Sequence, residues 1–337
     1  MRAAALGFAQ VGRRFLLRLS RRINRLGHSV PLVIPAPDAA LEDPAQIDGA
    51  TATVFTKCST ADQYESYVRE HQELFQRRVD FEARLVPRHE RFRVKGDCAA
   101  CKRETAFFVD FLYSSSDRDS ERVPNWREHL VCHRCKLPNR LRAVIDFMEQ
   151  VPAPDRLDSL YVTEQTTPFF RFVKQRYPNT TGSELLRDGT ALGKTNVLGV
   201  RNEDLTALTL RDSSVKVICT TDVLEHVPDY TKAIAECFRV LQPGGALIIS
   251  VPFILNSRET LVRARVNADG STHHLLAPEY HGDAQNPHGV LCYYHFGWDL
   301  LDSLRETGFS DSALYFYWSA ARGYLGGAPF LICATKP

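Results

Sequence analysis

Residues 215–252 form the stretch that most limits how this chain can fold. A short apolar run, Val215–Cys219, ends in polar residues, and an amphipathic helical pattern follows it. The Pro-Gly-Gly sequence at 243–245 ends that helix, and Ala246–Val251 has the character of a second buried strand. Strand, helix and strand in this order predict a parallel βαβ unit. Because ligands bind at the carboxyl ends of strands in open parallel sheets, we expect the chemistry to involve residues 222–226.

This stretch resembles the class I S-adenosylmethionine-dependent methyltransferases, in particular the type 11 group. Four short motifs carry the resemblance. They are an acid after the strand at 215–219, then Leu-Glu-His, Arg-Val-Leu and Pro-Gly-Gly, which are here Asp222, Leu224–His226, Arg239–Leu241 and Pro243–Gly245. Over about residues 95–337 the chain is similar to a bacterial subgroup with an N-terminal four-cysteine module. The further motifs shared with that subgroup are Arg140–Ala143, Thr163–Pro168, Gly182–Glu184, Asp222–Asp229 and Pro278–Asp283.

The resemblance implies an α/β fold with a Rossmann-like seven-stranded sheet and helices on both faces. The expected strands are Ser159–Glu164, Thr180–Glu184, Asn196–Val200, Val215–Cys219, Ala246–Val251, Ala313–Trp318 and Pro329–Thr335. Helices are expected at Thr167–Tyr177 and Gly297–Thr307, and the second of them ends at Gly308. The predicted domains are a basic arm and linker at 1–50, a helical and zinc-binding module at 51–150, and a methyltransferase domain at 151–337.

The resemblance also implies S-adenosyl-L-methionine as the cofactor and assigns its contacts. Glu184 corresponds to the carboxylate that accepts both ribose hydroxyls, and Glu203 and Asp204 lie where the family binds the adenine amino group. The family has a glycine-rich turn after the first strand, whereas this chain has Thr163–Pro168 with no glycine. Side chains such as Thr163 and Glu164 would then hold the cofactor, together with Asp222. The alternative is a decayed cofactor site in a scaffold domain.

Four cysteines occur as two Cys-x-x-Cys pairs, Cys98 with Cys101 and Cys132 with Cys135. Two such pairs supply all four ligands of a closed tetrahedral site, so the spacing predicts structural Zn²⁺. Two disulfides or a redox pair are the alternatives. The other five cysteines are scattered in apolar settings, and no secretory signal is evident, which favours a metal in a reducing cytoplasm. Helical patterns are expected at Asp62–Arg84 and at Pro138–Gln150, and strand character at Phe107–Tyr113.

The first 37 residues hold seven arginines, no lysine and no acid, although the whole chain carries a net charge of only +2. Residues 38–337 are therefore net acidic. Within residues 8–26, apolar side chains fall on one helical face and arginines largely on others, which is typical of a basic amphipathic helix. Such a helix can lie on an anionic membrane surface, serve as a mitochondrial transit peptide, or pack on protein. The expected location is cytoplasmic, with peripheral contact at the inner face of the membrane as a further expectation.

A long segment at 253–298 is rich in histidine and tyrosine, and five of the eleven histidines fall within residues 273–295. An insertion at this place is expected to cap the substrate over the strand ends. A neutral histidine can take a proton from an acceptor hydroxyl. The candidate catalytic residues are His226, His274, His281, His295 and Asp222. The histidines and acids would also suit a second metal, although their spacings match no known motif.

The leading hypothesis is an S-adenosylmethionine-dependent methyltransferase that O-methylates a sugar-containing or secondary-metabolite small molecule. The first alternative keeps the fold and makes the substrate an RNA base, with the zinc module used for binding. The net acidic character of residues 38–337 argues against nucleic acid, because phosphate binding requires a basic surface. The second alternative is a catalytically silent scaffold.

Overall fold

The computed structural model describes residues 32–34, 53–87, 91–116, 122–282, 286 and 288–337. The predicted amphipathic helix of residues 8–26 lies outside these ranges. The chain divides into two compact units, each built from separate segments of the sequence. The first unit comprises Met1–Thr56, Ser66–Phe147 and Phe316–Phe330, and the second comprises Lys57–Glu65, Met148–Tyr315 and Leu331–Pro337. None of the helices in the described ranges combines the length and the apolar character that crossing a bilayer requires.

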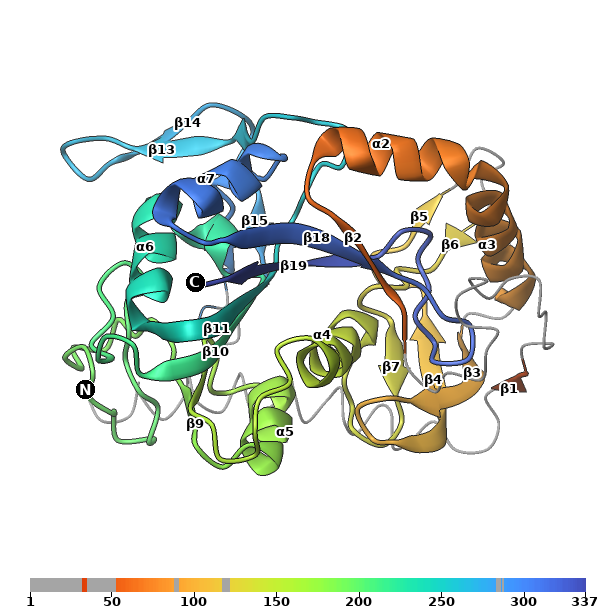
Figure 1. Ribbon diagram of the computed structural model, residues 1–337, viewed down its shortest axis with the longest axis horizontal. Coiled ribbons are helices and arrows are strands. Elements are labelled where there is room, and N and C mark those ends of the chain that lie inside the picture. Colours follow the sequence, from red (N-terminus) through yellow and green to blue (C-terminus); the bar gives the residue numbers. More distant parts are fainter. Residues whose placement is uncertain (1–31, 35–52, 88–90, 117–121, 283–285, 287) are drawn as a thin grey trace. The chain divides into compact units, whose positions relative to one another are not determined.

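A seven-stranded sheet has the order β2-β18-β19-β11-β10-β8-β9 (Figure 1). Its strands are β2 (Phe55–Cys58), β18 (Asp311–Tyr317), β19 (Phe330–Thr335), β11 (Leu241–Ser250), β10 (Val215–Thr221), β8 (Leu160–Val162) and β9 (Thr180–Gly182). β9, β8, β10 and β11 run parallel to one another, whereas β19 is antiparallel to β11. The predicted α/β fold is therefore confirmed, with a mixed central sheet.

Three helices of the second unit form within the segments that the sequence predicts to be helical. α5 (Pro168–Arg176) begins at Thr167, whose side chain accepts a hydrogen bond from the Phe170 amide. α6 (Tyr230–Val240) is capped in the same way by Asp229, and it packs against β11 and α7. The prediction that Pro243–Gly245 separates this helix from the next strand is wrong, because these residues lie within β11 (Leu241–Ser250), which begins directly after the helix. α7 (Asp299–Thr307) ends at Gly308, whose φ of 116° lies in the left-handed region that favours glycine.

The predicted strand at Asn196–Val200 is wrong, because these residues form a turn. The Asn196 side-chain oxygen accepts hydrogen bonds from the amides of Leu198 and Val200, which replace strand pairing. Val197 is 99% exposed, so the apolar character of this run does not reflect burial. Only single bridges remain here, one of them between Glu184 and Asn202. The seventh strand is instead β2, which comes from far upstream in the sequence and lies at the edge of the sheet opposite β9.

The insertion after β11 is folded into three short two-stranded ribbons. β12 (Leu261–Val262) pairs with β17 (Tyr294–His295), β13 (Ala264–Val266) with β14 (Thr272–His274), and β15 (Tyr280–His281) with β16 (Val290–Leu291). All three pairs are antiparallel. The sequence shows no clear period here, because two or three residues are too few to produce an alternating pattern.

The first unit contains a four-stranded sheet of order β1-β3-β4-β7. Its strands are β1 (Leu32–Val33), β3 (Arg91–Cys98), β4 (Arg103–Asp110) and β7 (Leu130–Cys132), and a further short pair is β5 (Ser115–Ser116) with β6 (Arg122–Val123). The predicted helix at Pro138–Gln150 is α4 (Asn139–Gln150). The predicted helix at Asp62–Arg84 is two helices, α2 (Ala61–Glu70) and α3 (Gln72–Leu85), because the backbone of His71 between them is not helical.

One buried arginine joins distant segments of the first unit. Arg142 of α4 is fully buried and donates hydrogen bonds to the carbonyls of Arg322 and Gly323 at 2.8 and 2.7 Å. Its guanidinium also lies 4.0 Å from the centre of the Phe107 ring. Because a buried charge must be compensated by polar partners, these carbonyls tie the segment 316–330 to α4. This contact explains why residues close to the C-terminus belong to the first unit.

Candidate functional sites

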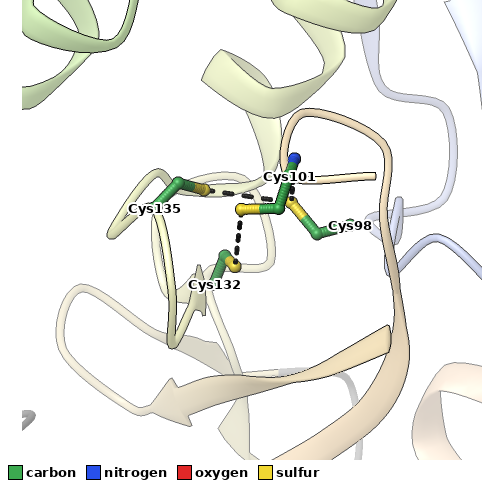
Figure 2. Close-up of side chains that lie close together, drawn as sticks. All are labelled: Cys98, Cys101, Cys132 and Cys135. Atoms are coloured by element: carbon green, nitrogen blue, oxygen red, sulfur yellow. Dashed lines mark hydrogen bonds between the residues drawn. The ribbon is translucent and has the colours of Figure 1, made fainter. Parts of the chain in front are cut away.

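The four cysteines of the two Cys-x-x-Cys pairs lie together in the first unit (Figure 2). The hairpin between β3 and β4 carries Cys98 and Cys101, and the turn after β7 carries Cys132 and Cys135. The two turns have the same backbone geometry. In each, the amide of the residue after the second cysteine donates to the carbonyl of the first, at 2.7 Å for Lys102 and 3.0 Å for Lys136. Both lysines have a positive φ, 54° and 63°.

The sulfur positions fit a tetrahedral metal site. The Sγ atoms of Cys98 and Cys135 are 3.8 Å apart, and those of Cys101 and Cys132 are 4.0 Å apart. Tetrahedral zinc with Zn–S bonds of about 2.3 Å requires Sγ–Sγ separations of about 3.8 Å. Backbone amides of Cys101 and Arg134 point to sulfur atoms at 3.4 Å, which stabilises thiolate ligands. All four residues are free cysteines, so the alternative of two disulfides is not what the structure contains.

The second unit brings carboxylates together at the ends of its parallel strands. Glu164 follows β8, Glu184 follows β9, and Asp222 follows β10. The Glu164 carboxylate accepts a hydrogen bond from the Thr221 hydroxyl at the end of β10. Thr163 lies beside it, and its buried hydroxyl has no hydrogen-bond partner among the described residues. An orphaned hydroxyl at this place is what a site for a polar ligand would leave.

Glu184 holds the glycine-free loop that follows β8. Its Oε1 accepts hydrogen bonds from the amides of Gln165 and Thr166, both at 2.9 Å, and from the Thr166 hydroxyl at 2.8 Å. A carboxylate anchor of this kind fixes a loop that lacks glycine. Gly182, two residues earlier, is required for packing, because a Cβ there would lie 2.4 Å from the Phe170 ring and 2.9 Å from the Glu164 carbonyl.

The two acids predicted to bind adenine have different surroundings. Glu203 is buried, and its oxygens accept hydrogen bonds from the Arg201 guanidinium and from the amide and hydroxyl of Thr209. Its carboxylate therefore holds the local loop together. Asp204 is half-buried and caps a turn by accepting from the amide and hydroxyl of Thr206 at 2.8 Å. Of the two, Asp204 is the one that solvent reaches.

Asp222 adopts a left-handed backbone conformation with a φ of 53°. Its amide donates to the Ser250 carbonyl at 2.7 Å, and its carboxylate accepts from the Ser250 hydroxyl at 3.0 Å. Only residues such as Asn and Asp adopt this conformation readily apart from glycine. The conformation turns the chain sharply at the end of β10 and leads into the short helix η2 (Leu224–His226).

Three of the four predicted catalytic histidines lie in one polar cluster. His226 is on η2, His281 on β15 and His295 on β17. The rings of His226 and His281 are 4.9 Å apart and nearly perpendicular. His281 and His295 each place Nε2 3.0 Å from Oε1 of Glu279. His274 is not part of this cluster, because it is exposed on β14.

Glu225, Glu279 and Cys292 complete the cluster, and no sequence pattern assigned them a role. Proximity to Cys292, Glu225 and Glu279 raises the pKa of the His281 imidazole to about 11, so this ring carries a proton when nothing else neutralises the acids. Both acids are close in sequence to predicted catalytic residues: Glu225 lies between Asp222 and His226, and Glu279 lies two residues before His281. Neither spacing identifies a site without knowledge of how β15 folds back onto η2.

Comparisons with known proteins find similarity to methyltransferases in the part of the chain that carries β9, β10 and β11. Residues 166–249 match a family model described as a methyltransferase domain. A probable S-adenosylmethionine-dependent methyltransferase of Mycolicibacterium smegmatis is 43% identical over 53 residues, which is 16% of this chain and 21% of that protein. An uncharacterized 37.1 kDa protein from a transposon of Streptomyces fradiae is 45% identical over 49 residues, 14% of each chain. The chain thus spans about a fifth or less of the length of these relatives.

Likeness to solved structures is weak. A crystal structure of an S-adenosylmethionine-dependent methyltransferase from Mesorhizobium loti matches 58% of this chain and 96% of its own, at 16% identity and a TM-score of 0.34. A putative enzyme of the same kind from Listeria monocytogenes matches 55% of this chain and 93% of its own, at 14% identity and a TM-score of 0.32. The family match and the Mycolicibacterium relative together show that this part of the chain is similar to the methyltransferase domain of S-adenosylmethionine-dependent methyltransferases.

Proposed function

We propose that the protein is an S-adenosylmethionine-dependent methyltransferase that O-methylates a sugar-containing or secondary-metabolite small molecule, and that it carries structural zinc. The observation that carries the proposal is the group of carboxylates at the ends of β8, β9 and β10, within and beside the segment that matches the methyltransferase family. Parallel strand ends are where this fold class binds its ligands. The orphaned Thr163 hydroxyl supports a polar ligand at the same edge.

Each residue at the strand ends has a role in this proposal. Glu184 would accept hydrogen bonds from the ribose diol, and Asp204 from the adenine amino group. Thr163, Glu164 and Asp222 would hold the methionine end. When bound, S-adenosylmethionine supplies a methyl group on a positively charged sulfur. Acids near that position favour the cation, and the loop fixed by Glu184 limits the positions it can take.

The insertion would supply the acceptor side of the site. His281 lies against His226 of η2, and β17, which carries His295, also packs on η2. His226 comes four residues after Asp222 in the chain. His226 or His295 would receive the proton that an acceptor hydroxyl loses as the methyl group arrives, because His281 already carries one. The tyrosines of the insertion suit stacking on a sugar or another ring, which supports an acceptor of this class.

Ligand-dependent thermal stability tests the proposal. We expect S-adenosylmethionine and S-adenosylhomocysteine to raise Tm, since a ligand at 100 times its Kd adds about 2.7 kcal/mol to the free energy of unfolding. NAD⁺ and ATP, which bind other folds with parallel sheets, serve as controls and should leave Tm unchanged. If neither S-adenosylmethionine nor S-adenosylhomocysteine raises Tm, the protein would be a scaffold. A rise in Tm with NAD⁺ alone would indicate a different enzyme class.

A further inference from the structure

We infer that Glu225, His226 and His281 form a binding site for a divalent transition-metal ion, distinct from the four-cysteine site. The three residues belong to the second unit, and their ligand atoms all lie within 4.8 Å of one another. Two imidazoles and one carboxylate are a donor set that binds Zn²⁺ or Fe²⁺.

The buried carboxylate of Glu225 is the strongest evidence for a cation-binding site. Its side chain is fully buried, and neither oxygen has a hydrogen-bond partner among the described residues. An isolated buried carboxylate is costly unless a cation compensates it. The nearest nitrogens are Nδ1 of His281 at 3.5 Å and Nε2 of His226 at 3.7 Å. These contacts are too long for good hydrogen bonds, yet they leave room for an ion between the groups.

The separations fit a shared metal. Zinc with bonds of 2.0–2.1 Å to nitrogen and oxygen holds neighbouring tetrahedral ligand atoms about 3.3–3.5 Å apart. The two measured separations from Glu225 Oε1, 3.5 and 3.7 Å, are close to this value. Small side-chain rotations would therefore be enough to complete the coordination.

Hydrogen bonds on the far side of each ring direct the correct nitrogen toward Glu225. The Nδ1 of His226 lies 2.9 Å from the Leu291 carbonyl, which can only accept, so Nδ1 carries the hydrogen and Nε2 presents its lone pair. The Nε2 of His281 lies 3.0 Å from the Glu279 carboxylate, which leaves Nδ1 as the ligand atom. Metal-binding histidines usually have such a partner on the other nitrogen.

Glu279 and Cys292 act as supports in this arrangement. The Glu279 carboxylate already makes hydrogen-bond contacts with His281 and His295 and an ion pair with the guanidinium of Arg263 at 3.1 Å. The Cys292 thiol donates to the Tyr294 carbonyl at 3.2 Å. Glu279 and Cys292 make hydrogen bonds at 3.0 and 3.2 Å, whereas the Glu225 oxygens have only the two longer contacts to His281 and His226, so the ion is assigned to Glu225 rather than to Glu279.

The site retains an open side. The His226 and His281 side chains are 14% and 30% exposed, whereas Glu225 is inaccessible. Three protein ligands with an accessible fourth position are typical of metal sites that bind water or substrate, unlike the closed four-cysteine site. Resting on the proposed function, we infer further that the acceptor presents a hydroxyl to this ion, which would lower the pKa of that hydroxyl.

Metal content of the full-length protein, measured with Zn²⁺ in the absence of S-adenosylmethionine, tests the site. We expect two zinc ions per chain in the wild type, and one in His281→Ala and in Glu225→Gln. His273→Ala removes an exposed histidine from β14 of the same insertion and should keep two. Near-wild-type circular dichroism of the variants would show that the lost ion is not a consequence of unfolding.

Two results would overturn the inference. One is a wild-type protein that binds a single zinc, in which case the proton on His281 alone neutralises the acids. The other is a His281→Ala variant that retains two ions. Calorimetric titration of the wild type already holding one zinc gives the same answer without a variant, because only a second site would give a saturable heat change. Neither measurement depends on methyl-donor binding, so a failure here is distinguishable from a failure of the proposed function.

Discussion

Replacing Cys98 with serine is expected to remove one zinc ion per chain and to unfold the first unit. Cys98 is fully buried, and its sulfur lies 3.8 Å from that of Cys135 across the predicted ion. Structural zinc contributes about 10–16 kcal/mol in small zinc-binding domains, which is comparable with the whole stability of a domain. Loss of one of four ligands therefore leaves too little free energy to keep β3, β4 and β7 folded.

Tryptophan fluorescence and metal analysis check this expectation together. Trp126 and Trp318 belong to the first unit and are buried, so their emission should shift to longer wavelength when that unit unfolds. Cys237→Ser is the matched control, because it changes a buried thiol of α6 that is remote in sequence from both pairs. A Cys98→Ser protein with unchanged zinc content and unchanged emission would show that the four cysteines do not hold a structural metal.

Replacing Glu184 with alanine is expected to weaken binding of S-adenosylmethionine by about 30-fold or more. Hydrogen bonds to a charged group contribute about 1.5–3 kcal/mol each, and the variant loses those to the ribose. It also releases the loop at 165–166, which Glu184 holds through three hydrogen bonds to Oε1. Both losses act in the same direction, so the effect should exceed that of removing a ribose contact alone.

Calorimetric titration of folded protein measures this change in Kd. Glu184→Gln separates the two contributions, because its carbonyl oxygen still accepts from the loop while its amide group cannot accept from the second ribose hydroxyl. Its affinity should lie between those of the wild type and the alanine variant. Glu306→Ala removes an exposed glutamate from α7 and should bind as the wild type does. Affinities within threefold of wild type in both Glu184 variants would contradict the proposed ribose contact.

Local patterns in the sequence predicted the elements whose partners are close in the chain. The βαβ unit around α6, the helix start at Thr167 and the helix end at Gly308 depend on period, capping and turn residues, and all are found in the structure. Each Cys-x-x-Cys pair closes its own turn in the same local way. Such features require no information from elsewhere in the chain.

Features that depend on distant contacts were missed. The strand predicted at Asn196–Val200 fails because the Asn196 side chain competes for the backbone amides, and its place in the strand count is taken by β2 from residues 55–58. The cluster around Glu225 exists because β15 and β17 fold back toward η2, a step fixed by the hydrogen bond from the Tyr293 amide to the Glu225 carbonyl at 2.8 Å. No periodicity reveals such a contact.

Photolabelling with methyl-labelled S-adenosylmethionine tests the central claim most directly. Wild-type protein is irradiated with the ligand, digested, and the labelled peptide identified, with excess S-adenosylhomocysteine as competitor. We expect competed label between Leu160 and His226, the segment that carries the ends of β8, β9 and β10. Label that the competitor does not displace, or competed label confined to the first unit, would contradict a methyl-donor site at these strand ends.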